Sequence, residues 1–204
     1  MEKEMNNHYT DGALEIRSDG DKKDYIQGYA LIFDSMSEDM GFREIIRSGA
    51  LDNTDMSDVI FCLNHDVSMV LARNNKSDGV GALKLTVDSK GLFFEAQPTN
   101  TTYARDLVEN MRNGILTKCS FRFTLDYEDQ SSQSWDWDRD GKRGYDLRTI
   151  NKIKKIRDVS IVTFPAYESS VANTYIRAKE NYEAEIKEAE KLKNEKEKLL
   201  IELM

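Results

Sequence analysis

The sequence of 204 residues is poor in the residue types that build cross-linked or metal-bound folds. It contains only two cysteines, two histidines and two prolines. Cys62 and Cys119 lie in apolar runs typical of strands, so we expect buried thiols of a reducing compartment and no disulfide framework. Because the cysteines and histidines are not clustered, the sequence also argues against a structural zinc site.

The chain also lacks a basic excess and a long apolar run. Its formal net charge is −8, and a nucleic-acid-binding chain would normally show a basic stripe instead. No apolar run is long enough to cross a bilayer, and the first seven residues lack the apolar stretch of a secretory signal. We therefore expect neither nucleic acid nor membrane as a partner.

What the chain does contain is a series of short apolar segments typical of strands, and one amphipathic helix. The strand-like segments are 14–16, 25–33, 42–46, 59–63, 80–87, 91–96, 115–125 and 150–164. Between 103 and 113, Tyr103, Leu107 and Met111 recur every four residues, as on one face of a helix. Two threonines before this segment are candidate N-caps, and Gly114 is placed to end the helix.

The last 27 residues differ from the rest, because 14 of them are charged and none is glycine or proline. Their apolar positions follow a heptad seam that two lysines interrupt, which predicts a long solvated helix, with a coiled coil as an alternative. We expect three parts: a polar N-terminal segment with a first strand (1–24), a folded domain (25–177) and this charged helix (178–204).

Ser120 and Cys119 are the two candidate nucleophiles, and His65 is the candidate base. His65 is the one histidine expected in a folded segment, at the end of a buried strand, and a neutral imidazole is the usual base for a serine nucleophile. Strand alternation places Cys119 with Phe121 and Phe123 on an apolar face, and Ser120 with polar neighbours on the other face. The pattern therefore favours Ser120 over Cys119 as the nucleophile, with its side chain towards a wet cleft.

A third group should orient the imidazole and stabilise its cation. Asp158 begins an apolar run, and a carboxylate on a core strand needs a partner such as His65. Asp66 is the rival candidate, but it is poorly aimed at the ring of its own chain neighbour.

An acidic segment raises the alternative of a calcium site. Asp136, Asp138, Asp140 and Gly141 match the first half of an EF-hand loop. The twelfth position is Leu147, where a bidentate glutamate is required, and no flanking helices are expected. We interpret residues 141–144 as a hairpin tip and predict no metal site.

The candidate segments also resemble, in order and spacing, the prohead proteases of tailed phages. The resemblance runs from about Gly28 to Ala172 and rests on several segments of the chain. These are Gly28–Phe33, Phe42–Leu51, Leu63–Asp66, Lys118–Phe123 and Arg157–Tyr167.

The resemblance implies a mixed α/β fold, mainly an antiparallel β-barrel with surrounding helices, as in herpesvirus maturation proteases. It implies a serine endopeptidase that works without a cofactor inside the procapsid, in the cytoplasm of the bacterial host. Its substrates would be scaffold protein or the scaffold-like arm of the major capsid protein, and finally itself. A non-enzymatic assembly factor that keeps the fold is the alternative, and the charged helix could serve self-association.

The resemblance to the herpesvirus enzymes also suggests where the oxyanion is held. Backbone amides just after the strand of Asp158 would donate to it. Since Pro165 has no N–H, Ala166 or Tyr167 would have to serve. Arg122, on the same strand face as Ser120, could add its charge.

Overall fold

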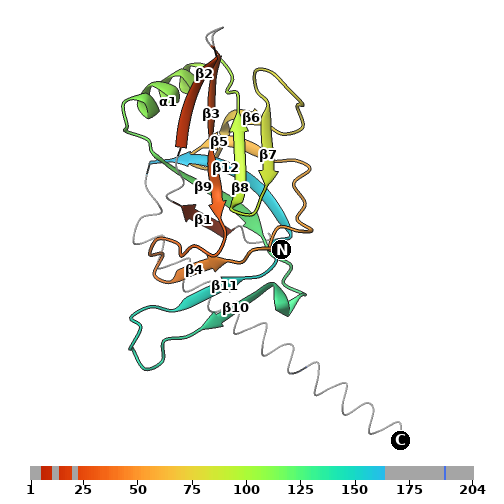
Figure 1. The fold of residues 1–204 in the computed structure, drawn as a ribbon, viewed down its shortest axis with the longest axis vertical. Coiled ribbons are helices and arrows are strands. Elements are labelled where there is room, and N and C mark those ends of the chain that lie inside the picture. Colours follow the sequence, from red (N-terminus) through yellow and green to blue (C-terminus); the bar gives the residue numbers. More distant parts are fainter. Residues whose placement is uncertain (1–5, 11–13, 20–22, 164–190, 192–204) are drawn as a thin grey trace, which may run out of the picture. The chain divides into compact units, whose positions relative to one another are not determined.

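The computed structural model describes residues 6–10, 14–19, 23–163 and 191. The described residues contain twelve strands, one α-helix and one short 3-10 helix, η1 (Figure 1). The strands are β1 (Asn6–Thr10), β2 (Leu14–Asp19), β3 (Lys23–Ile32), β4 (Arg43–Ile46), β5 (Ile60–Leu63), β6 (Asp66–Arg73), β7 (Leu83–Val87), β8 (Gly91–Ala96), β9 (Lys118–Thr124), β10 (Gln133–Asp136), β11 (Leu147–Ile150) and β12 (Lys155–Val162). The helices are α1 (Thr102–Arg112) and η1 (Gln130–Ser132).

The largest sheet has five strands in the order β1-β9-β12-β5-β6. All its neighbours are antiparallel except β12 and β5, which run parallel. The strand β1 pairs along β9, so the N-terminal residues 6–10 form one edge of this sheet. The three strands with the strongest apolar character, β5, β9 and β12, occupy its centre, as expected for strands covered on both faces.

Two smaller sheets complete the described fold. A four-stranded antiparallel sheet has the order β2-β3-β8-β7, and a three-stranded sheet has the order β10-β11-β4. The strands β7 and β8 form the hairpin that the sequence predicts around residues 88–90. Large side chains from the five-stranded and the four-stranded sheet meet in the core, where the ring centroids of Phe61 and Phe94 lie 5.4 Å apart.

The helix α1 confirms the sequence prediction closely. The Thr101 side chain accepts a hydrogen bond from the backbone N–H of Ala104, which makes Thr101 the N-cap. Gly114, with φ of 70°, follows the helix in a left-handed conformation. The helix buries Leu107 and Val108 against the core, the stripe expected from its apolar spacing.

The expected fold class is wrong. Strands are the main regular structure of the described residues, they form three separate sheets without a closed barrel, and α1 is the one α-helix of more than one turn among these residues. Alternating apolar residues identify strands, but which strands pair, and whether a sheet closes, depends on non-local contacts that no alternation records.

The charged C-terminal segment lies outside the described residues except for Lys191, so the long helix expected at 178–204 has no support. All twelve strands and α1 belong to one of the two units into which the chain divides, residues 1–165. Within the described ranges, no helix combines the length and the apolar character that crossing a membrane requires.

Candidate active site

The centre of the five-stranded sheet places polar side chains in cross-strand rows. Ser160 on β12 is the register partner of both Ser120 on β9 and Cys62 on β5. Two residues earlier on β12, Asp158 is the partner of Arg122 on β9. Since side chains two residues apart share a face of a strand, both rows lie on the same face of the sheet. A register shift between Ile156 and Asp158 marks a bulge where the chain approaches these rows.

His65 reaches this face from a two-residue hairpin between β5 and β6. Asn64 and His65 both have positive φ, 51° and 59°, which is the left-handed pair of a type I′ turn. Asparagine and histidine are among the few residues that adopt this conformation readily. The tight turn projects the imidazole back over the neighbouring strands β12 and β9.

The three residues form one hydrogen-bonded relay. His65 Nδ1 lies 2.6 Å from Asp158 Oδ1, and His65 Nε2 lies 2.9 Å from Ser120 Oγ. A carboxylate can only accept, so Nδ1 carries the ring proton and leaves Nε2 free to accept the proton of the serine hydroxyl. His65 thus joins two residues that lie 55 and 93 positions away in the sequence, and the three residues predicted from the sequence form one hydrogen-bonded chain.

The Asp158 carboxylate is held ionised. Burial raises its pKa, but the hydrogen bond from His65 and the charge and hydrogen bond of Arg122 outweigh that effect, and the pKa lies below its usual value. Its Oδ2 accepts from Arg122 Nε at 2.5 Å, and its Oδ1 accepts from Ser160 Oγ at 2.9 Å. Only 1% of its side chain is exposed.

The exposure of Ser120 differs from the expected wet cleft. Ser120 is fully buried, and of the three relay residues only His65 reaches the surface, with 12% of its side chain exposed. The imidazole of His65 lies against the Ser120 hydroxyl, and β1 and β12 pair with β9 along its two edges. Strand alternation identified the correct face, but it says nothing about what covers that face.

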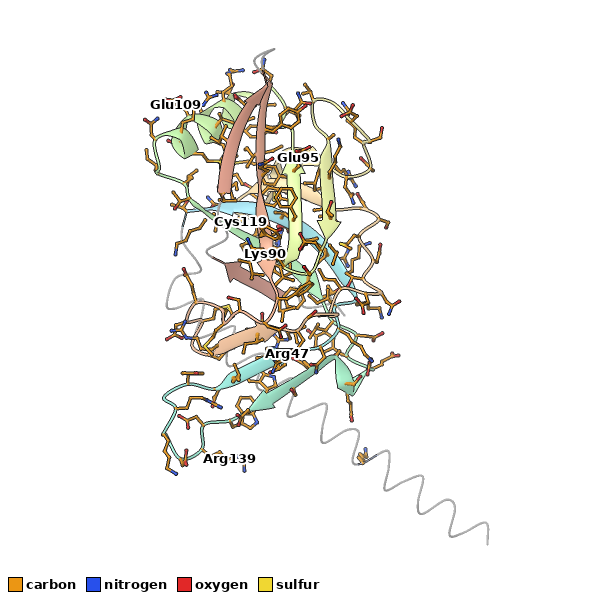
Figure 2. The ribbon with its side chains drawn as sticks, viewed as in Figure 1. Arg47, Lys90, Glu95, Glu109, Cys119 and Arg139 are labelled. Atoms are coloured by element: carbon orange, nitrogen blue, oxygen red, sulfur yellow. The ribbon has the colours of Figure 1, made fainter. Side chains whose placement is uncertain are left out.

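Both thiols are buried, as the sequence predicts. Cys119, labelled in Figure 2, lies in the core on the other face of β9. Cys62 lies in the row of Ser120, with its Sγ 2.9 Å from Ser160 Oγ. Burial raises the pKa of Cys62 to about 12, so this thiol stays protonated at neutral pH.

The remaining sequence candidates fall in different places. Arg122 donates to Asp158 and to the backbone oxygen of His65, so its guanidinium lies beside the Asp158 carboxylate. Asp66 accepts hydrogen bonds from the N–H and hydroxyl of Ser68. Ala166 and Tyr167 lie outside the described residues. Ser160 is the residue that sequence reasoning missed, because nothing in its local pattern reveals that it faces the relay.

The acidic loop between β10 and β11 is cross-linked by its own residues. Asp136 pairs with Arg143 at 2.5 Å, and Asp138 accepts from the backbone N–H groups of Arg143 and Gly144. Among the described residues, no group of three or more His, Cys, Asp or Glu could hold a metal ion.

A serine hydroxyl, an imidazole and a buried carboxylate in this order are the arrangement that many serine hydrolases use. The sequence pattern of the caudovirus prohead serine proteases matches residues 12–185. The chain therefore belongs to the caudovirus prohead serine protease family, the serine proteases of phage capsid maturation.

A solved structure shows the same fold. The structure of the bacteriophage T4 capsid assembly protease, gp21, aligns with a TM-score of 0.53 and 14% sequence identity, over 81% of this chain and 100% of the T4 chain. At this identity the likeness concerns the fold alone. No protein with a curated description matches the chain.

Proposed function

We propose that the chain is a serine endopeptidase in which Ser120 is the nucleophile, His65 the general base and Asp158 the group that orients the imidazole. The observation that carries this proposal is the unbroken relay from Ser120 Oγ through both ring nitrogens of His65 to Asp158. Membership of a serine protease family supports the reaction class.

The relay geometry gives each atom a step. Ser120 Oγ bonds to the carbonyl carbon of the scissile peptide while its proton passes to His65 Nε2. Asp158 stabilises the resulting imidazolium through the Nδ1 proton. His65 then gives the Nε2 proton to the leaving nitrogen as the C–N bond breaks, which leaves an acyl-enzyme. A water molecule then attacks the acyl carbon while its proton passes to His65 Nε2. The bond between this carbon and Ser120 Oγ breaks, Oγ takes the proton from Nε2, and the acid is released.

Two features of the site bear on the substrate. Ser120 is buried in the free chain, so the cover over its hydroxyl must move when a peptide binds. The tetrahedral oxyanion needs N–H donors, and the backbone amides of Ala166 or Tyr167, a few residues beyond β12, stay our candidates for this role.

The substrates we propose are scaffold protein, the scaffold-like arm of the major capsid protein and the protease itself. These are the proteins that surround a prohead protease inside the procapsid in the host cytoplasm. We further propose that residues 178–204 serve association with scaffold or with another copy of the chain, while residues 25–177 contain the protease. The high charge of this segment supports a role at the surface.

The test uses two neighbouring substitutions on β9. Ser120→Ala should abolish cleavage of the cognate capsid and scaffold proteins, followed by mass spectrometry, and should leave the circular dichroism spectrum unchanged. Cys119→Ser is the matched control, because it changes the adjacent candidate nucleophile on the opposite face. Its new hydroxyl can keep the bond that Cys119 Sγ makes to Tyr29 O, so the variant should fold and cleave.

Unchanged cleavage by a folded Ser120→Ala protein would falsify the assignment of the nucleophile. Loss of cleavage in a folded Cys119→Ser protein would instead indicate a thiol enzyme.

A further inference from the structure

The His65 turn is fastened to the sheet through its backbone as well as its ring. The backbone N–H of Asn64 donates to the carbonyl of Ile161 at 2.8 Å, and the Asn64 side chain accepts from the N–H of Thr163 at 3.0 Å. Both partners belong to the end of β12 or follow it directly. The turn that presents the imidazole is thus attached to the strand that presents Asp158.

Arg122 fixes the same two parts of the relay a second time. Its Nε donates to Asp158 Oδ2 at 2.5 Å, and its Nη2 donates to the backbone oxygen of His65 at 2.8 Å. The side chain is 15% exposed, and its planar fork makes both bonds from one rigid group. A single guanidinium therefore sets the position of the carboxylate relative to the backbone that carries the imidazole.

Ser160 provides the matching link on the other carboxylate oxygen. Its hydroxyl donates to Asp158 Oδ1 at 2.9 Å, the atom that also accepts from the ring of His65. The Ser160 hydroxyl oxygen in turn accepts from the backbone N–H of His65 at 3.2 Å and lies 2.9 Å from Cys62 Sγ. Since a hydroxyl has one proton and two lone pairs, Cys62 completes the set by donating its S–H.

We propose that Arg122 and Ser160 are positioning residues that hold the Asp158 carboxylate and the His65 turn in a fixed relative position. In this proposal the charge of Arg122 also partly neutralises the negative charge of Asp158. Neither residue needs to touch the substrate in this role. The proposal rests on the relay described under Proposed function and deepens it.

The charge of Arg122 has a consequence for pH dependence. The charged and titratable groups around the imidazole are Asp158 on β12, Arg122 on β9, Cys62 on β5 and Asp66 at the start of β6. Arg122 is the one cation in this set. Without it, the charge of Asp158 would favour the imidazolium, which cannot act as a base. The acid limb of the rate profile should then move to higher pH.

The experiment follows the rate at which a fluorophosphonate labels Ser120, which needs no knowledge of the natural substrate. In this reaction the serine oxygen bonds to phosphorus, fluoride leaves and the hydroxyl proton passes to His65. Intact mass reports the labelling, and the first-order inactivation rate is separated from reagent affinity by varying reagent concentration. The variants are Arg122→Gln, Arg122→Lys and Ser160→Ala, each checked for folding by circular dichroism.

We expect Arg122→Gln to lower the inactivation rate on the order of 10²-fold, as for a small displacement of catalytic groups, with little change in reagent affinity and with its acid limb at higher pH. Arg122→Lys should restore the wild-type acid limb but not the full rate, because an ammonium keeps the charge without the rigid fork. Ser160→Ala should lower the rate without moving the acid limb, since it removes no charge.

Arg73→Gln is the matched control. Arg73 also binds an aspartate through two nitrogens, Asp58 at 2.6 Å each, but on the exposed surface. The fluorophosphonate should label Ser120 of the Arg73→Gln variant at the wild-type rate.

Wild-type rates and pH profiles in both Arg122→Gln and Ser160→Ala would overturn the proposal. A loss of reagent affinity alone would also overturn it, because it would indicate direct contact with the bound group. If Arg122→Gln does not fold, Ser160→Ala decides the matter. Labelling that persists in Ser120→Ala would instead refute the proposed nucleophile, which keeps the two failures distinct.

Discussion

Among the residues that the structure describes, two arginine–carboxylate pairs with buried carboxylates look alike and differ in what surrounds them. In the five-stranded sheet, Arg122 and Asp158 are cross-strand partners. In the three-stranded sheet, Arg148 and Glu44 are cross-strand partners as well, with Nη1 and Oε2 3.1 Å apart. Both carboxylate side chains are 1% exposed.

The two ion pairs differ in the side chain that lies next to each of them. Beside Asp158 stands the imidazole of His65, which binds a serine hydroxyl. Beside Arg148 stands the amide of Gln133, whose oxygen accepts from Arg148 Nε at 2.8 Å, and the indole of Trp135 lies 5.7 Å from the guanidinium. An amide and an indole cannot carry a proton through neutral pH. A buried ion pair therefore supports chemistry only where its neighbour can titrate.

The largest effect should come from Asp158→Asn. An amide at this position can hold the wrong imidazole tautomer, and the corresponding change in a chymotrypsin-type triad costs on the order of 10⁴ in turnover. The measurement is the cleavage rate of folded protein. Cleavage at the wild-type rate would make Asp158 a structural residue, equivalent to Glu44.

Glu44→Gln should lower the stability of the fold and leave the reactivity of the active site unchanged. It leaves the buried guanidinium of Arg148 without its counter-charge, and breaking a buried ion pair costs about 3–5 kcal/mol in unfolding free energy. Urea denaturation measures the loss, and the active-site labelling rate of the protein that remains folded should match wild type. A selective loss of labelling would show that the two charged sites are coupled.

A smaller difference should appear in the pH dependence of stability. The folded-state pKa of Asp158 is lowered, so its contribution is present above the unfolded value of about 4 and is lost as pH falls through the folded pKa. Between pH 7 and acid pH, wild type should therefore lose more unfolding free energy than Asp158→Asn. Urea titrations of both proteins over this range provide the comparison, and parallel curves would contradict it.

The smallest effect is expected at Cys62, although it lies in the same cross-strand row as Ser120. With a pKa raised to about 12 by burial, it supplies almost no thiolate at neutral pH. The folded protein should resist iodoacetamide, and mass spectrometry should find Cys62 modified only after unfolding. Rapid alkylation of the native protein would show that this face opens readily to solvent.

The relay residues could be predicted because each leaves a local mark. Ser120 differs from Cys119 by strand alternation, His65 ends a buried strand, and Asp158 is a charge on a core strand. The roles of Ser160 and Arg122 could not be predicted in this way, because they depend on the register of β12 against β5 and β9. Alternation assigns a face to a residue but not a neighbour.

The same limit explains the errors in the fold. The pairing of β1 with β9 joins residues more than 100 positions apart, and the sequence gives no local sign of it. Likewise, Glu44 and Arg148 each stand in short strands whose patterns do not reveal a parallel partner. The helix α1 was predictable because its cap, its stripe and its terminating glycine are all local.

The left-handed turn that carries His65 subjects one position to two separate kinds of selection. In a saturation library, protein abundance at position 65 should follow the backbone, so that glycine, asparagine and aspartate are tolerated and β-branched residues are depleted. Activity should accept only the imidazole. At position 120, where the backbone is an ordinary strand, abundance should instead follow side-chain volume. The proposed base and the proposed nucleophile would thus show different mutational signatures.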